Sequence, residues 1–172
     1  GQMRVSGTTV FQSDLLVSAG SRFDVDLSSP TVVMNGVLTN RGEMRWISDC
    51  NRFDLQGSGR VENEGLWEIF ADSACHNGSE AIVRVPVNVP VGGKLLLSTN
   101  GVARFIVGSS LDVAGELEIQ SGGRLRFENS GPAHDLNLTS AAVLSGNGTL
   151  QMDGSNRLIL AAGDLDTTVA VD

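Results

Sequence analysis

A short pattern of glycine and apolar residues repeats along most of the sequence. Counted from Gly65, apolar side chains lie ten and four residues before the glycine and two and four residues after it, at Leu55, Val61, Trp67 and Ile69. A repeat longer than a heptad and shorter than a domain indicates a solenoid or a similar array, in which each copy packs on the next. The repeat therefore limits the possible folds more than any single motif does.

Five further copies fill the same positions, and their anchor glycines lie 22 to 33 residues apart. In the copy around Gly20, the last two apolar residues are displaced by one position. The other copies fit without displacement. The copies are Gly20 with Val10, Leu16, Phe23 and Val25; Gly42 with Val32, Leu38, Met44 and Trp46; Gly93 with Val83, Val89, Leu95 and Leu97; Gly115 with Phe105, Leu111, Leu117 and Ile119; and Gly148 with Leu138, Leu144, Leu150 and Met152.

Apolar and polar residues alternate within each copy, which is typical of a strand with one buried face. Helical spacing is absent, and Gly, Ser, Asn and Asp recur at intervals too short for long helices. We therefore predict an all-β solenoid of six to seven rungs, with roughly 22–25 residues and three short strands in each. Successive rungs should stack about 4.8 Å apart.

Two stretches depart from the repeat. Val85–Val91 contains two prolines, which cannot donate to a ladder on both sides, so we expect a corner or a frayed edge there. Gln120–Phe127 resembles a partial copy of one half-rung and accounts for most of the longest interval.

The composition fits a solenoid. A single domain of 172 residues can bury a sizeable core, yet aromatic residues make up only 5% of the chain and Tyr is missing. A solenoid tolerates this because each rung needs only a few aliphatic side chains stacked on their equivalents. We interpret residues 1–172 as one domain. Because the chain starts at Gly1 without an initiator Met and ends inside a predicted strand, we expect it to be a fragment of a longer protein.

The net charge of −8 argues against nucleic acids and anionic membrane surfaces as partners, because both require basic patches. No run of about 18 apolar residues occurs, so we expect no membrane insertion of this segment.

Cys50 and Cys75 follow their anchor glycines by similar distances and should fall at the same corner of neighbouring rungs. Adjacent strands bring such positions to about 5 Å, within the range that a disulfide tolerates. The bridge predicts an oxidising location, secreted or at the cell surface, whereas two free thiols would indicate a reducing one. Asn77, Asn137 and Asn147 begin glycosylation sequons if the host is eukaryotic, although Asn with Gly and Ser or Thr is also ordinary turn chemistry.

Paired carboxylates are the first candidates for chemistry on the surface. Glu62 and Glu64 should share one face, and Glu116 and Glu118 another. Carboxylates about 5 to 10 Å apart serve glycoside hydrolysis, but a solvated acidic strand face has the same pattern. Stacking should also place Arg45 beside Glu68 as a cross-strand ion pair.

His76 and His134 are weaker binding candidates. Both lie in polar loops, in different rungs, and neither has a nucleophile or a second His at metal-binding spacing. We expect surface histidines, with no metal site and no cofactor.

Repeats reading apolar-x-x-x-Gly-x-apolar-x-apolar, as in 111–119 and 144–152, resemble the rungs of right-handed parallel β-helices in autotransporter passengers and haemagglutinin-type adhesins. The resemblance covers about residues 5 to 160 and implies a single-stranded right-handed parallel β-helix. Polysaccharide lyases and galacturonidases share that fold, but their Arg-x-Lys and His-Gly signatures are absent here.

Two functions follow as expectations. The first is a non-enzymatic structural and adhesive module, a stalk segment of a secreted or cell-surface protein. Its partners would be neighbouring rungs or domains of the same polypeptide, and a glycan or surface protein contacted by loops 71–80 and 128–135. The alternative is a carbohydrate-active module that binds or cleaves a polysaccharide along an acidic face.

Overall fold

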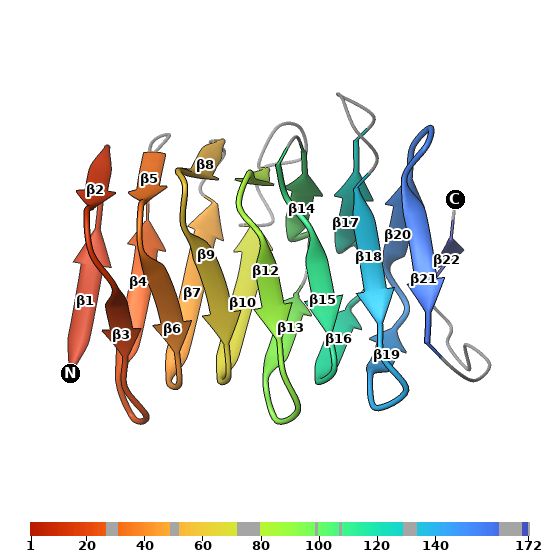
Figure 1. Cartoon of the computed structure of the whole chain (residues 1–172), viewed down its shortest axis with the longest axis horizontal. Helices are drawn as coiled ribbons and strands as arrows, with labels where there is room; N and C mark the ends of the chain where they lie inside the picture. The colour runs from red at the N-terminus through yellow and green to blue at the C-terminus, as the bar shows by residue number, and fades with distance from the viewer. Residues whose placement is uncertain are drawn as a thin grey trace.

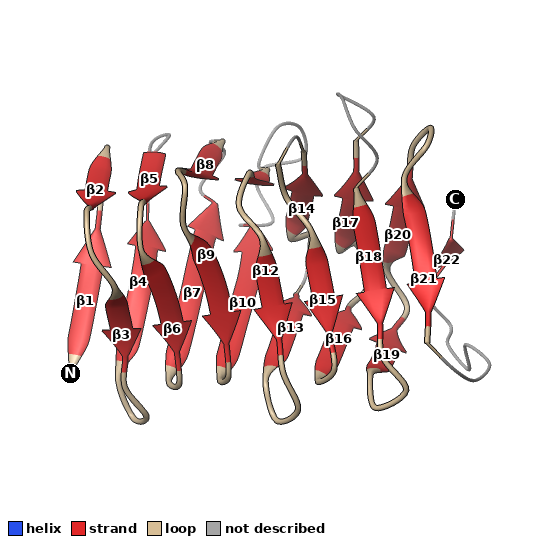
Figure 2. Ribbon diagram, in the orientation of Figure 1, coloured by secondary structure: helices blue, strands red, loops and turns tan. Residues whose placement is uncertain are grey.

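The structure is a computed structural model that describes residues 1–26, 31–48, 52–71, 80–98, 100–106, 108–128, 134–161 and 170–171. Within these ranges the regular elements are all strands, joined by turns and loops (Figure 2). The chain winds about its long axis from the N-terminal to the C-terminal end in a right-handed coil (Figure 1). The prediction of an all-β solenoid is therefore confirmed, with about six turns.

Three parallel sheets run along the coil, and each turn adds one strand to each sheet. Sheet A contains β1 (Gln2–Val5), β4 (Arg22–Asp26), β7 (Glu43–Ser48), β10 (Leu66–Ala71), β13 (Lys94–Leu97), β16 (Glu116–Ile119) and β19 (Val143–Gly146).

Sheet B follows sheet A along the chain in every turn. It contains β2 (Thr9–Phe11), β5 (Thr31–Met34), β8 (Phe53–Gln56), β11 (Ala81–Val83), β14 (Val102–Phe105), β17 (Arg124–Phe127), β20 (Thr149–Met152) and β22 (Ala170–Val171).

Sheet C completes the turn and leads back to sheet A. It contains β3 (Leu15–Val17), β6 (Val37–Asn40), β9 (Arg60–Asn63), β12 (Val87–Val89), β15 (Leu111–Val113), β18 (Asp135–Leu138) and β21 (Arg157–Leu160).

Columns of apolar side chains fill the interior, because the register places equivalent residues of successive rungs beside each other. One column in sheet A reads Phe23, Met44, Trp67, Leu95 and Leu117, all at most 1% exposed. Each residue packs on its equivalents above and below, as expected for a solenoid. The rung length ranges from 20 residues, between Gln2 and Arg22, to 28 residues, between Leu66 and Lys94.

The anchor glycines are required by the close approach of successive turns. A Cβ atom on Gly65 would collide with the carbonyl oxygen of Gly42 in the preceding rung, and one on Gly115 would collide with that of Gly93. Only glycine can bring the backbone this close to its neighbour.

In the first rung, the predicted inward positions are wrong. Val10 and Leu16 are 48% and 54% exposed and lie on the outer face. The register instead pairs Phe11 with Met34 and Leu15 with Leu38. Apolar residues occupy both faces of these short strands, so alternation alone could not choose between the two registers.

The copy around Gly148 is wrong by one strand. Leu144 belongs to sheet A, where it pairs with Leu117, and Leu150 belongs to sheet B, where it pairs with Leu125. The reason is that a glycine precedes strands of sheet B as well, as in Gly123 before β17. The partial copy predicted at 120–127 is therefore a complete sheet B strand with its preceding turn.

The proline-containing stretch is a central strand with corners on both sides. β12 pairs with β9 and with β15. Pro86 and Pro90 lie immediately outside it, where the missing N–H costs no ladder bond. The prediction of a corner or a frayed edge is therefore wrong for Val87–Val89, and the corners lie at the two prolines on either side.

Candidate functional site

The candidate carboxylates lie on two separate parts of the surface. Glu116 and Glu118 are in β16 on the outer face of sheet A, whereas Glu62 is in β9 on sheet C. Glu64 follows β9 in the turn that leads to sheet A. The fold thus keeps the two sequence-adjacent pairs apart and does not bring all four residues together.

Glu116 and Glu118 share one ammonium group. Lys94 Nζ lies 3.0 Å from Glu116 and 2.5 Å from Glu118, because the register places β13 beside β16. Gln120 also donates a hydrogen bond to Glu118, at 2.9 Å. The hydrogen bonds from Lys94 and Gln120 lower the pKa of Glu118, although burial acts in the opposite direction. A general acid in glycoside hydrolysis needs a raised pKa, so Glu118 is poorly suited to that role.

Glu62 and Glu64 each contact an arginine. Arg60 Nε lies 2.7 Å from Glu62, and the Asn88 amide donates to the same carboxylate at 2.7 Å. Arg41 Nε lies 2.8 Å from Glu64, where both side chains are substantially exposed. These contacts join neighbouring rungs or neighbouring residues and do not converge on a common point.

In the first four rungs of sheet A, charged residues of opposite sign alternate in one column, which reads Arg4, Asp24, Arg45 and Glu68. Asp24 is only 3% exposed and accepts hydrogen bonds from Arg22 at 2.7 Å and Gln2 at 2.8 Å. Burial would raise the pKa of Asp24, but these hydrogen bonds and the nearby positive charges outweigh burial and lower it. In the next rungs, Arg45 Nε lies 3.1 Å from Glu68, which confirms the predicted cross-strand pair.

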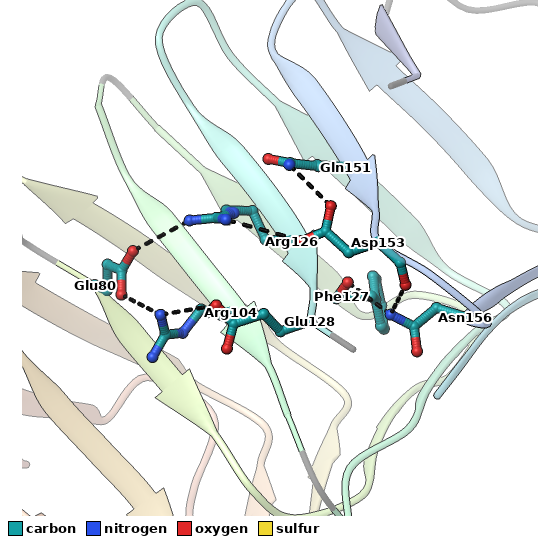
Figure 3. A network of polar contacts seen from close by, with 8 residues as sticks. All are labelled: Glu80, Arg104, Arg126, Phe127, Glu128, Gln151, Asp153 and Asn156. Atoms are coloured by element: carbon teal, nitrogen blue, oxygen red, sulfur yellow. Dashed lines mark hydrogen bonds and ion pairs between the residues drawn. The ribbon is translucent and has the colours of Figure 1, made fainter. Parts of the chain in front are cut away.

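A second charged network covers the outer face of sheet B (Figure 3). Arg104 and Arg126 lie side by side in register. Arg104 Nη1 lies 3.2 Å from Glu80 and 3.1 Å from Glu128. Arg126 contacts Glu80 at 3.5 Å and Asp153 at 3.9 Å. Three carboxylates thereby hold two adjacent guanidinium groups together across the rungs.

Sequence reasoning missed this network. The signal available was the repeated apolar-Arg-Phe of 103–105 and 125–127, which places arginine on the outer face once the strand register is known. The carboxylates come from strand ends and turns, whose positions do not follow from the repeat.

A buried pair of asparagines was also missed. Asn40 and Asn63 are completely buried at the ends of β6 and β9. Asn40 donates to Asn63 Oδ1 at 2.7 Å and to the Leu66 carbonyl at 2.9 Å, and Asn63 donates to the Lys94 carbonyl at 2.8 Å. The signal was an Asn two residues before each of the glycines Gly42 and Gly65.

His134 is buried, so the predicted surface position is wrong. Its side chain is 3% exposed, and Nδ1 lies 3.2 Å from the carbonyl oxygen of Ser109 in the preceding rung. That oxygen can only accept, so Nδ1 carries a proton, while Nε2 is buried without a hydrogen-bond partner. The backbone N–H of His134 donates to Asn156 at 2.9 Å, which joins the corner before β18 to the corner before β21.

The sequons differ in their surroundings. The Asn137 amide donates to Asp112 at 2.5 Å on sheet C, whereas Asn147 is exposed in the turn between β19 and β20. Glycosylation stays a prediction. Cys50, Cys75, His76 and Asn77 lie outside the described residues.

The described ranges contain no cluster of three or more His, Cys, Asp or Glu side chains arranged to hold a metal ion. The same ranges contain no helix long and apolar enough to cross a membrane.

Comparisons with protein-family models, characterised proteins and solved structures found no significant match.

Proposed function

We propose that the chain is a structural and adhesive module, a stiff stalk segment of a secreted or cell-surface protein. The continuous register of three parallel sheets supports this proposal. Each rung contacts mainly its neighbours, so the chain forms an elongated body that lengthens with each added rung. Such a body suits a spacer that carries a binding surface away from its point of attachment.

The single observation that carries the proposal is that the candidate carboxylates are held in ion pairs. The carboxylates that could serve catalysis are held by Lys94, Arg60 and Arg41. Most of these contacts, and those of Arg45 and Arg104, cross from one rung to the next. Pairs of this kind resist separation of the rungs, whereas an active site would leave at least one carboxylate available to the substrate.

The proposed type of protein is an adhesin related to autotransporter passengers or haemagglutinin-type proteins, and the repeat pattern is the support for it. Its partners would be neighbouring rungs or domains of the same polypeptide and a glycan or surface protein. An extracellular location follows from the predicted bridge between Cys50 and Cys75. Most of loops 71–80 and 128–135 lies outside the described residues.

A glycan array combined with a reducing-sugar assay on acidic polysaccharides tests the proposal. We expect binding without turnover. Turnover that is abolished in Glu118→Gln and preserved in Glu64→Gln would contradict the proposal and favour the carbohydrate-active alternative. Glu64 is a suitable control because its pair with Arg41 lies in an exposed turn.

A further inference from the structure

A polar groove lies at the corner where sheet B leads into sheet C. Its cavity volume is about 770 Å³, and it crosses several successive turns of the coil. The lining comes from the turn before β3, the turns from β5 to β6 and from β8 to β9, and the residues around Arg84 and Gly108.

Several glycines line the groove, among them Gly57 and Gly59. Gly57 has a φ of 124°, which few other residues adopt. A Cβ atom on Gly57 would collide with the Met34 carbonyl, and one on Gly59 with the Gly36 carbonyl. The stacking of the rungs therefore requires glycine at both positions.

Two arginines supply positive charge to the groove. Arg60 is 56% exposed, and its Nε is held by Glu62 at 2.7 Å. Arg84 Nε is buried without a hydrogen bond, and the nearest carboxylate oxygen, on Asp54, is 3.5 Å away and also lacks one. Arg84 is thus held by charge, and the 33% of its side chain that is exposed, not the buried Nε, is what a ligand in the groove could contact. A ligand carboxylate, which accepts two parallel hydrogen bonds, matches a guanidinium group of this kind.

The N-terminal end of the groove offers acceptors. Asp14 Oδ1 accepts a hydrogen bond from the Val37 N–H at 2.8 Å. This bond fixes the carboxylate and leaves its second oxygen as an acceptor for a ligand. Asn35 donates to Gln12 at 3.0 Å and keeps its own oxygen as an acceptor. Donors at one end and acceptors at the other suit hydroxyl groups, because each hydroxyl can both donate and accept.

The backbone at the groove argues against an extended peptide that would add a strand. The N–H of Gly59 already donates to Met34 at 2.8 Å, and the N–H of Arg60 donates to Gly36 at 3.3 Å. A peptide that binds by strand addition needs free main-chain groups at a sheet edge. These groups are used inside the coil.

We propose that this groove binds a linear, hydroxyl-rich glycan that carries carboxylate groups, with Arg60 and Arg84 contacting the carboxylates. From the rung of Asp14 to that of Gly108 there are four rung spacings, about 19 Å, which is enough for an oligosaccharide. The inference rests on the proposed adhesive function and gives the chemistry of its partner. It places that partner in the groove at the corner between sheets B and C, instead of on loop 71–80, which joins sheet A to sheet B, or on loop 128–135, which joins β17 to β18.

Isothermal titration calorimetry with a hexamer of uronic acid tests the inference. The comparison ligands are the same hexamer with its carboxyl groups reduced to alcohols and a sulfated oligosaccharide of equal length. We expect the uronate to bind at least about tenfold more tightly than either, because a charge-assisted bidentate contact is lost or misshapen in both. Added salt should weaken uronate binding, since the contacts are ionic.

Arg84→Gln and Arg60→Gln should each weaken uronate binding by about tenfold. Arg124→Gln is the matched control, because Arg124 is exposed at the start of β17 on sheet B and does not line the groove. Arg60→Gln changes a more exposed side chain, so it keeps the test informative if Arg84→Gln fails to fold. Thermal unfolding of each variant verifies its fold.

Absence of uronate binding would overturn the inference, as would unchanged affinity in both groove variants. Equal affinity for the reduced or the sulfated oligomer would also overturn it, because the carboxylate would then have no role. If the glycan array shows binding to other glycans without turnover, the adhesive function stands and only the groove assignment fails.

Discussion

Two neighbouring rungs in the first half of the coil and the rungs that follow them form the corner between sheets C and A in two ways. Between sheets C and A, the turns after β6 and β9 contain two residues each, and a buried Asn precedes both. The register places Asn40 beside Asn63. From β12 onward the same column continues with apolar residues, Val89, Val113 and Leu138.

The comparison shows that the amide column is one way to satisfy a tight corner and not a requirement of the fold. After β15 the turn is equally short, but there the N–H groups of Ala114 and Gly115 both donate directly to the Val89 carbonyl, at 2.8 and 3.0 Å. After β12 and β18 the turns are longer and form their own internal hydrogen bonds. The backbone polar groups are therefore satisfied in each case, as buried polar groups must be.

The interior differs between the same two regions. Trp46 packs on Trp67 and Phe53 with ring centroids 4.6 Å apart, whereas the later rungs contain stacked aliphatic residues and one pair of phenylalanines, Phe105 and Phe127. The first region therefore concentrates large side chains and buried amides in two rungs.

The largest expected effect is the loss of a central aromatic side chain. Trp67→Ala should lower the free energy of unfolding by about 3–5 kcal/mol, because it removes a completely buried side chain and leaves a cavity beside Trp46. Urea denaturation followed by circular dichroism measures the change. A loss below about 1 kcal/mol would show that the rungs of Trp46 and Trp67 are not more tightly packed than the later rungs.

Exchanging the corner residues tests the comparison next. Asn63→Val should destabilise by about 1–3 kcal/mol, because the Lys94 carbonyl and the Asn40 amide each lose a partner. The reverse change, Val113→Asn, should also destabilise, since its neighbours in the column, Val89 and Leu138, offer the amide no equivalent partner. Chemical denaturation of both variants gives the answer, and a stabilised Val113→Asn would contradict the account.

The third prediction concerns pH and the buried Asp24. Its pKa is lowered in the folded protein, so its contribution is present above its unfolded pKa, about 3.9, and is lost as the pH falls through the lower folded value. Asp24→Asn should therefore destabilise at pH 7 by about 1.5–3 kcal/mol, and the difference from the parent should shrink in acid. Unfolding measurements between pH 7 and pH 2 test this.

Asp135 is the matched control for Asp24. Its pKa is also lowered, by hydrogen bonds from Arg157, but that arginine is 63% exposed. Solvent screens such a pair, so Asp135→Asn should have the smaller effect at pH 7. An equal effect at both sites would mean that burial does not strengthen the Asp24 contacts.

The smallest expected effect is at the exposed pair between Arg41 and Glu64. Arg41→Gln should change the free energy of unfolding by roughly 0.5 kcal/mol or less, because both side chains are well hydrated. A thermal melt with and without added salt measures it. A large, salt-sensitive loss would show that the cross-rung charges stabilise the coil more than buried contacts do.

The sequence predicted the architecture because glycine spacing and strand alternation are repeated properties. Gly65 and Gly115 are required wherever the backbone of one rung approaches the next, so their spacing reports the coil directly. The glycine spacing does not show to which of the three sheets a given strand belongs, because glycine also precedes strands of sheet B. For that reason the copy around Gly148 was placed one strand out of phase.

The polar contacts could be predicted only in part. The pair of Arg45 and Glu68 followed from the repeat because both residues occupy equivalent strand positions. Glu80, Glu128 and His134 lie at strand ends or in corners, where insertions change the position of each residue. Their contacts depend on how each corner is built, and the repeat does not contain that information.

The central claim is that equivalent residues of successive rungs are separated by the same distance along the axis of the coil, namely the spacing between neighbouring strands. Pulsed electron paramagnetic resonance with spin labels on Arg22 and, in turn, on Lys94, Glu116 and Val143 tests it most directly, because these positions share one column of sheet A. The Cα separations should rise in equal steps, to about 14, 19 and 24 Å. Distances that do not increase with rung number, or that change unevenly, would contradict the coil.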